Sequence, residues 1–282
     1  MFGGLKAKAR DKEKELIHYL GSLDSLLVAF SGGVDSSFLL ALAHQILGDR
    51  LLGATARSIT YPQRELDGAV RFARERGIRH IVFESGEMGL PEFLSNGPDR
   101  CYHCKKALCA ELQELAAEES LEYVAHAVNM DDLNDYRPGL RAAREMGVIT
   151  PLINARLSKD EIRFLSLEMG LSTWDKAAMA CLASRIPYGE SITEEKLMMV
   201  ETSEAFLAES GFRLFRVRHH GSVARIEIDG PEIERIVEPG LKEALVAKFR
   251  EIGFAYVAVD IEGYKMGSMN RVLKDVEKER RG

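Results

Sequence analysis

The sequence lacks any apolar run that approaches the ~20 residues needed to cross a membrane. Its basic start, Met1 to Arg10, is not followed by the apolar core of a secretory signal. These absences predict a cytoplasmic protein with no membrane partner. In that compartment the four cysteines are expected to be thiols or metal ligands rather than disulfides.

Positive charge is not in excess either, because the formal net charge is −6 at pH 7. A mildly acidic balance argues against nucleic acid as the main partner. The sequence also contains no internal repeat. Its 282 residues, of which 46% are apolar, suit one large domain or two modest ones with a sizeable core.

Short apolar segments alternate with helical patterns in the first half of the chain. This alternation predicts an α/β fold with a parallel sheet and helices on both faces. Ligands in such sheets bind beyond the carboxyl ends of the strands, where Ser31, Ser58 and Asn129 each follow an expected strand. The expected strands cover residues 26–30, 51–56, 80–84 and 122–127, the expected helices cover 11–20, 38–43, 63–77, 102–119 and 137–146, and residues 148–152 end the run.

The pattern changes after about residue 170. An irregular segment is followed by a long helix, two segments that alternate with period two, a helix broken near Pro239-Gly240, and a last strand. We therefore predict two domains, residues 1–170 and 171–282, of which the second is a smaller α+β domain. The expected elements are 174–189 (irregular), 193–210, 213–218, 223–228, 233–252 and 254–259, with 274–282 as a frayed helix end.

Residues 31–37 (Ser-Gly-Gly-Val-Asp-Ser-Ser) connect an expected strand to an expected helix. A glycine-rich turn in this position exposes backbone N–H groups at the positive end of the helix, which is an anion site. No Gly-Lys-Ser/Thr follows at the Walker A spacing, so the loop suits a leaving pyrophosphate better than a γ-phosphate in transfer. The segment resembles the PP-loop of ATP pyrophosphatases, which cleave ATP between its α- and β-phosphates and adenylylate a substrate oxygen. The alternative is an ordinary strand–turn–helix corner.

Three carboxylates, Asp131, Asp132 and Asp135, follow the fourth expected strand within five residues. They would repel one another unless a cation or solvent intervened. Mg²⁺ bound to ATP phosphates is one such cation, since it takes one or two protein carboxylates. The alternative is a capped helix start, in which the carboxylates face the helix dipole. After a PP-loop, we favour the position close to ATP.

Cysteines form one Cys-x-x-Cys pair, Cys101 and Cys104, while Cys181 stands far downstream. A zinc ion, a redox dithiol and an iron–sulfur cluster are all compatible with the pair. A structural zinc site requires four ligands, and the sequence offers no second pair. Three thiolates suit a 4Fe–4S cluster with one open iron, which can hold hydrosulfide. Cys109 falls within an apolar helical pattern and is expected to be a small buried hydrophobe.

Cys181 is followed closely by Ser184 and Arg185. A nearby cation lowers the pKa of a thiol and favours the thiolate, which attacks or ligates. The alternative is a buried cysteine in a tight segment between domains.

Arg216 and Arg218 lie two residues apart on an expected strand and therefore share one face. Two guanidinium groups on one face can grip a substrate phosphate bidentately. A solvated strand face is the alternative. Glu204 and Glu227 are weaker candidates for metal binding or acid–base chemistry near the same pocket.

Five segments together resemble the LarE family, over about residues 12–270. The resemblance implies a PP-loop ATP pyrophosphatase fold and part of the synthesis of the nickel-pincer nucleotide cofactor of lactate racemase. The family adenylylates a carboxylate of pyridinium-3,5-biscarboxylic acid mononucleotide and converts it to a thiocarboxylate. The segments are 31–37, 135–139, 181–189, 216–221 together with 224–227, and 263–270.

Family members that have only the equivalent of Cys181 give up its sulfur and are left with dehydroalanine. This chain also has Cys101 and Cys104, so it resembles the three-cysteine branch, in which the thiolates hold a 4Fe–4S cluster and sulfide on the open iron is the donor. That difference favours catalytic over sacrificial sulfur transfer. The resemblance also implies a homo-oligomer, either a trimer or a hexamer, supplied by sulfide or a sulfur-delivery system.

The expected roles follow from this interpretation, with ATP and Mg²⁺ as further cofactors. A PP-loop tRNA thiolase, an amide-forming enzyme of the GMP or NAD synthetase type and a non-catalytic metal-binding protein are the alternatives. Expected site residues are Ser31, Gly32, Gly33, Asp35, Ser36, Ser58, Asp135 and Arg137 for the nucleotide, with Asp35 and Asp135 near Mg²⁺; Cys101, Cys104 and Cys181 for the cluster; Cys181, Ser184 and Arg185 for catalysis; and Arg216 and Arg218 for the substrate phosphate.

Overall fold

The computed structural model describes residues 2–134, 138–177, 179–265 and 268. The chain divides into two compact units. The first contains Met1–Leu90 and Cys101–Met179, and the second contains Pro91–Arg100 and Ala180–Gly282. The division falls after Met179, whereas the sequence pattern placed it after residue 170, and the excursion at Pro91–Arg100 had no signal in that pattern.

The first unit is built on a parallel sheet of four strands in the order β3-β2-β1-β4. Ile149 adds an isolated parallel bridge to Ala125 of β4. Leu26 and Val28 of β1 pack into one apolar cluster, and Leu27 packs into the other, so both faces of the strand are buried. The strands are β1 (Leu26–Ala29), β2 (Leu51–Arg57), β3 (His80–Glu84) and β4 (Tyr123–His126).

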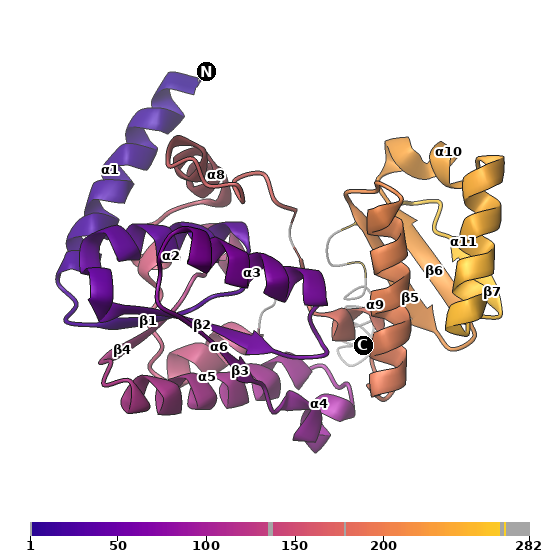
Figure 1. Ribbon diagram of the computed structural model, residues 1–282, viewed down its shortest axis with the longest axis horizontal. Helices are drawn as coiled ribbons and strands as arrows, with labels where there is room; N and C mark the ends of the chain where they lie inside the picture. Colours follow the sequence, from indigo (N-terminus) through magenta and orange to yellow (C-terminus); the bar gives the residue numbers. More distant parts are fainter. Residues whose placement is uncertain (1, 135–137, 178, 266–267, 269–282) are drawn as a thin grey trace, which may run out of the picture. The chain divides into compact units, whose positions relative to one another are not determined.

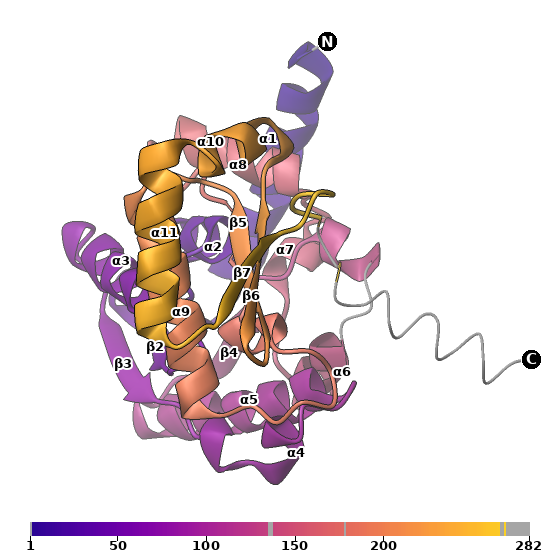
Figure 2. The same cartoon turned by 90° about the vertical axis from the view of Figure 1, so that its right-hand side faces the viewer.

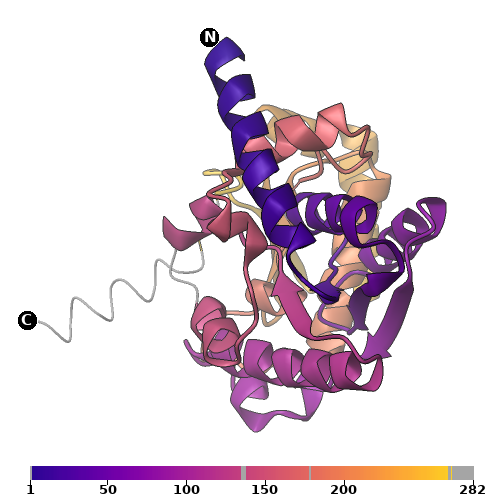
Figure 3. The same ribbon diagram turned by 90° about the vertical axis from the view of Figure 1, so that its left-hand side faces the viewer.

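Helices cover both faces of this sheet (Figure 1), which confirms the predicted α/β fold. On one face, α1 packs against α2 and α8 (Figure 3). The opposite face is covered by α5 and α6. The helices are α1 (Phe2–Gly21), α2 (Val34–Leu47), α3 (Gln63–Glu75), α5 (Arg100–Glu118), α6 (Pro138–Glu145), α7 (Pro151–Asn154) and α8 (Lys159–Glu168), with short 3₁₀ turns η1 (Gly48–Arg50), η2 (Glu87–Gly89) and η3 (Met130–Asn134).

Helix α8 was absent from the sequence expectations, which ended the first run of elements at residue 152. The signal was present as a capping box, in which Ser158 and Glu161 bond reciprocally to each other's backbone N–H groups. The first helix also begins earlier than expected, at Phe2 rather than residue 11.

The second unit contains a mixed sheet in the order β5-β6-β7, in which β5 and β6 are antiparallel and β6 and β7 are parallel. Helices α9 and α11 lie side by side along it (Figure 2). The helical segment 233–252 is broken before Pro239, as predicted. The elements are α4 (Pro91–Leu94), η4 (Leu182–Arg185), α9 (Glu194–Glu209), β5 (Phe215–His220), β6 (Val223–Ile228), η5 (Gly230–Glu232), α10 (Ile233–Ile236), α11 (Pro239–Ile252) and β7 (Tyr256–Val259).

Alternation decides which side chains of β5 and β6 form this core. Phe215 and Val217 of β5 pack into it, and so do Ala224 and Ile226 of β6. The residues between them therefore point to the other face of the sheet. No helix within the described residues combines the length and the apolar character that crossing a membrane requires.

Candidate functional site

The loop that connects β1 to α2 is closed on itself by Ser36. Its hydroxyl accepts a hydrogen bond from the Ser31 N–H (3.3 Å), lies 3.1 Å from the Ser31 hydroxyl and donates to the Gly33 carbonyl (3.2 Å). Gly32 has a φ of +69°, and a Cβ atom there would lie 3.2 Å from the Cβ atom of Ala69. The loop thus requires glycine at this position for both backbone conformation and space.

Helix α2 starts from this loop without a side-chain cap. Gly33 is the N-cap residue and has no side chain to accept from the first turn. The N–H groups of that turn and the positive end of the helix dipole are therefore available to an anion.

Two lysines bring positive charge to the loop from distant parts of the first unit. The Lys176 ammonium lies 2.9 Å from the Gly32 carbonyl oxygen and 2.8 Å from a Glu65 carboxylate oxygen. The Lys159 ammonium, at the start of α8, pairs with the Asp35 carboxylate. Neither lysine was predicted, because the contacts join residues 124 and 144 positions apart in the sequence.

The Asp35 carboxylate interacts with both Lys159 and Asn129. Burial raises the pKa of Asp35 above its ordinary value, although the Lys159 ammonium opposes that shift. Its Oδ1 atom and the Nδ2 atom of neighbouring Asn129 are both buried, and a hydrogen bond from the Asn129 side chain also favours the carboxylate form of Asp35. A carboxylate in this position, at the start of α2, can serve as a ligand of a metal ion.

The other carboxylates after β4 cap backbone groups. The Asn129 side chain accepts from the Asp131 N–H (2.8 Å), while Asp132 accepts from the Asn129 N–H (3.1 Å). Asp131 accepts from the Lys159 N–H at 2.7 Å. For Asp131 and Asp132, the structure thus favours the capping interpretation. Asp135 and Arg137 lie outside the described residues.

A cavity of about 110 Å³ adjoins the loop, between the carboxyl ends of β1 and β2 and one side of α5. Lys105 of α5 lies 3.0 Å from the His126 Nε2 atom in its wall, and burial lowers the pKa of this lysine. The walls are largely apolar, which suits a flat ring. The lining includes Ala29, Phe30, Ser31, Ala54, Thr55, Arg57, Ser58, Tyr61, Phe83, Lys105, Leu108, Leu112 and His126.

Ser58 also lines this cavity, but its hydroxyl is engaged within the protein. It donates to the buried carboxylate of Glu87, which also accepts from Thr60 (3.0 Å) and from Ser85. Glu87 thereby ties the loop after β2 to the loop after β3, a role that sequence analysis missed.

Cys101 and Cys104 lie one turn apart at the start of α5, where Cys101 is exposed and Cys104 half-buried. Residues three apart on a helix share one side, so both thiols can face the same ligand. Cys109 is buried in the core under α5, as its apolar surroundings predicted. In the described part of the chain, no three His, Cys, Asp or Glu side chains are grouped closely enough to hold a metal ion.

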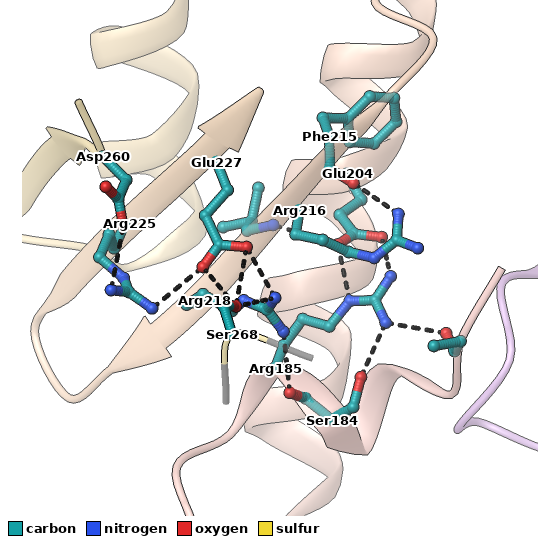
Figure 4. A network of polar contacts seen from close by, with 12 residues as sticks. Ser184, Arg185, Glu204, Phe215, Arg216, Arg218, Arg225, Glu227, Asp260 and Ser268 are labelled. Carbon is teal, nitrogen blue, oxygen red and sulfur yellow. Dashed lines mark hydrogen bonds and ion pairs between the residues drawn. The ribbon is translucent and has the colours of Figure 1, made fainter. Parts of the chain in front are cut away.

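In the second unit, Arg185 anchors the segment that begins at Cys181. Its fully buried guanidinium forms a two-pronged ion pair with Glu204 (2.8 and 3.0 Å). The same group donates to the carbonyls of Ala180 and Cys181 and to the Ser184 hydroxyl. Arg185 therefore positions this segment through its backbone against α9 (Figure 4).

Arg216 and Arg218 lie on the same face of β5, opposite the apolar core, as the alternation predicted. Arg218 donates to Glu227 (2.6 Å), the Ser184 carbonyl (3.0 Å) and the Ser268 hydroxyl (2.9 Å). Glu227 also accepts from Arg225, which pairs with Asp260 (Figure 4).

Burial lowers the pKa of Arg216, and the nearby Arg185 cation adds to this effect. Its guanidinium lies 5.0 Å from the centre of the Tyr264 ring. The arginine cluster thus consists of Arg185, Arg216, Arg218 and Arg225, with Glu204, Glu227 and Asp260 as their acidic neighbours. Such a cluster is suited to an anion, whereas a metal-binding role for these two glutamates stays a prediction.

No family model matches the sequence. Individual proteins do. An uncharacterized protein of Synechocystis sp. is 42% identical over 93% of this chain and 98% of its own length. The pyridinium-3,5-bisthiocarboxylic acid mononucleotide synthase of Lactiplantibacillus plantarum is 33% identical over 93% of this chain and 95% of its own length. A more distant relative, the glutamine-hydrolysing GMP synthase of Aeropyrum pernix, is 26% identical over 66% of this chain and 40% of its own length.

The similarity to the synthase extends over nearly the whole of both chains and covers the loop between β1 and α2 as well as the arginine cluster. The chain therefore belongs to the LarE family.

Proposed function

We propose that this protein is an ATP-dependent sulfur transferase that converts the carboxylates of pyridinium-3,5-biscarboxylic acid mononucleotide to thiocarboxylates. The relationship to the synthase over 93% of the chain carries this proposal, because both the loop and the arginine cluster lie within it. We also propose a cytoplasmic homo-oligomer supplied with sulfide or by a sulfur-delivery system, on the family resemblance alone.

ATP would bind in the first unit. The uncapped start of α2 and the Ser31–Ser36 loop offer donors to its phosphates, and the apolar cavity beside the loop suits its adenine ring. Lys159 and Lys176 would add positive charge where pyrophosphate leaves. Mg²⁺ would neutralise phosphate charge, and the Asp35 carboxylate in the first turn of α2 fits a role near it. Asp135 and Arg137 stay predicted members of this site.

The substrate would bind in the second unit through its phosphate. Arg218 is held by Glu227, and the Arg216 guanidinium donates to the Phe215 carbonyl (2.6 Å), so little ordering would accompany binding. A substrate carboxylate oxygen then attacks the α-phosphorus of ATP. The bond from that phosphorus to the bridging oxygen breaks, and pyrophosphate leaves with its electron pair. Hydrosulfide sulfur next attacks the acyl carbon, and AMP leaves with the acyl C–O bond's electrons while the S–H proton goes to solvent.

Cys101, Cys104 and Cys181 would hold the 4Fe–4S cluster. The first two thiols fit a shared ligand, since they lie one helical turn apart and are accessible. A cluster held by three thiolates keeps one iron free for the sulfide that the reaction consumes. In the alternative, Cys181 donates its own sulfur.

The test is anaerobic reconstitution with iron and sulfide, followed by assays of iron, acid-labile sulfide, pyrophosphate release and product mass. Cys101→Ala, Cys104→Ala and Cys181→Ala are compared with Cys109→Ala, a buried cysteine outside the proposed set. We expect about four irons per chain, retained only by the wild type and Cys109→Ala.

An iron-free wild type that becomes lighter by one H₂S at Cys181 during turnover would establish the sacrificial alternative. Full sulfur transfer by Cys181→Ala would contradict both versions. Pyrophosphate release that requires ammonia rather than the mononucleotide would instead indicate an amide-forming enzyme.

A further inference from the structure

Asn96 is a fully buried polar residue. It lies between α4 and α5 in the second unit and has a φ of +56°. Asparagine tolerates this left-handed conformation better than most residues. A buried side chain in such a conformation persists only where its surroundings hold it.

The Asn96 amide binds the segment that follows Cys181. The main-chain carbonyl of Asn96 accepts from the Gly189 N–H (3.1 Å), and the main-chain carbonyl of Leu94 accepts from the Ile192 N–H (2.9 Å). Main-chain hydrogen bonds and those of the Asn96 side chain therefore join residues 94–96 to residues 186–192. The Asn96 Nδ2 group donates to the carbonyls of Ile186 (3.3 Å), Pro187 (2.7 Å) and Glu190 (2.9 Å).

The other end of the same side chain binds the start of α5. Arg100, the first residue of that helix, donates to the Asn96 Oδ1 atom. Its guanidinium also lies 4.9 Å from the centre of the ring of Tyr188, which belongs to residues 186–192. Arg100 is buried, so both contacts are shielded from solvent.

Both thiol-bearing segments begin where the chain passes between the two units. One passage falls between Arg100 and Cys101, and the other falls between Met179 and Ala180, just before Cys181. Arg185 already holds the Cys181 carbonyl, and Ile186 is the next residue. The Asn96 contacts thus link the attachment point of one thiol segment to the continuation of the other.

We propose that Asn96 is a positioning residue that holds the segment after Cys181 in register with the start of the helix that carries Cys101 and Cys104. The amide is chemically required, because it offers donors to three carbonyls and an acceptor to Arg100. The functional consequence for sulfur chemistry rests on the proposed function, whereas the structural link does not.

The test compares Asn96→Gly and Asn96→Asp with the wild type. Glycine keeps the left-handed backbone but removes every side-chain bond. Aspartate keeps an acceptor for Arg100 but places an oxygen against the three carbonyls. Ser120→Gly is the matched control, since Ser120 has a φ of +55° just after α5, in the first unit, so glycine there makes the same backbone change away from the Asn96 contacts.

The readout that needs no cluster is the rate at which iodoacetamide modifies each cysteine, mapped by peptide mass spectrometry. We expect Cys181 to react about tenfold faster in both Asn96 variants than in the wild type and in Ser120→Gly. Cys109 must stay unreactive, which shows that each variant is folded. Iron content after reconstitution should fall in the same two variants.

If either Asn96 variant is unfolded, Arg100→Gln takes its place, because it breaks only the link to α5 and should accelerate Cys101 and Cys181 modification. Wild-type modification rates in folded Asn96→Gly would overturn the proposal. A wild type that binds no iron would refute the cluster, while the modification rates would still decide the role of Asn96.

Discussion

Two lysines reach the loop between β1 and α2 from distant positions in the sequence. The loop lacks the lysine of a Walker A sequence, yet Lys159 and Lys176 reach it from elsewhere in the first unit. Both are held by carboxylates, Lys159 by Asp35 and Lys176 by Glu65. A triphosphate can replace or share these partners, because charge-assisted bonds to phosphate are strong.

Lys176→Ala should weaken ATP binding about tenfold, because it removes one charge-assisted contact near the loop. Isothermal titration with a non-hydrolysable ATP analogue and Mg²⁺ measures this. Lys14→Ala is the matched control, since it removes an exposed lysine of the same unit. If the two variants bound the ATP analogue with equal affinity, Lys176 would not contribute to nucleotide binding.

Asp35→Asn should stabilise the protein at neutral pH while lowering ATP turnover. The pKa of Asp35 is raised in the folded state, so the folded protein binds its proton more tightly than the unfolded chain does. The free energy of unfolding therefore falls as pH rises through the interval from the unfolded to the folded pKa. Thermal unfolding above that interval should show a higher Tm for the variant, by roughly 2–4 °C. A lower Tm would indicate that the Lys159 pair outweighs desolvation.

At the scale of secondary-structure elements, the junction of β1 and α2 is specified by residues close together in the sequence. Strand, glycine turn and helix start were all readable from the sequence, because each depends on neighbouring residues. Helix α8 was missed although its capping box is local, since its apolar residues face a partner that the periodicity of a short segment does not reveal.

Gly32→Ala should destabilise the protein more than Gly77→Ala does. Both glycines have a positive φ, +69° and +63°, but only at Gly32 would the new Cβ press on Ala69. We expect losses of about 2 and about 1 kcal/mol in the free energy of unfolding, measured in urea. Comparable losses would mean that Ala69 yields without cost.

At the scale of the whole molecule, the loop between β1 and α2 belongs to one compact unit and the arginine cluster belongs to the other. Each ligand is therefore expected to order its own unit. Hydrogen exchange with a non-hydrolysable ATP analogue should protect residues 30–37 and 126–132, whereas nicotinic acid mononucleotide should protect 216–227. If the mononucleotide protected only the loop segments, the assignment of its phosphate to Arg216 and Arg218 would fail.

The sequence by itself determined the parallel sheet, the glycine loop and the shared face of Arg216 and Arg218. These features depend on backbone periodicity and local conformation, which a short segment specifies. Only the tertiary structure decided that Lys159 and Lys176 meet the loop, that Glu87 engages Ser58 and that Asn96 binds the segment after Cys181. Those partners lie far apart in the chain, and their pairing follows from how whole elements pack, which no local pattern encodes.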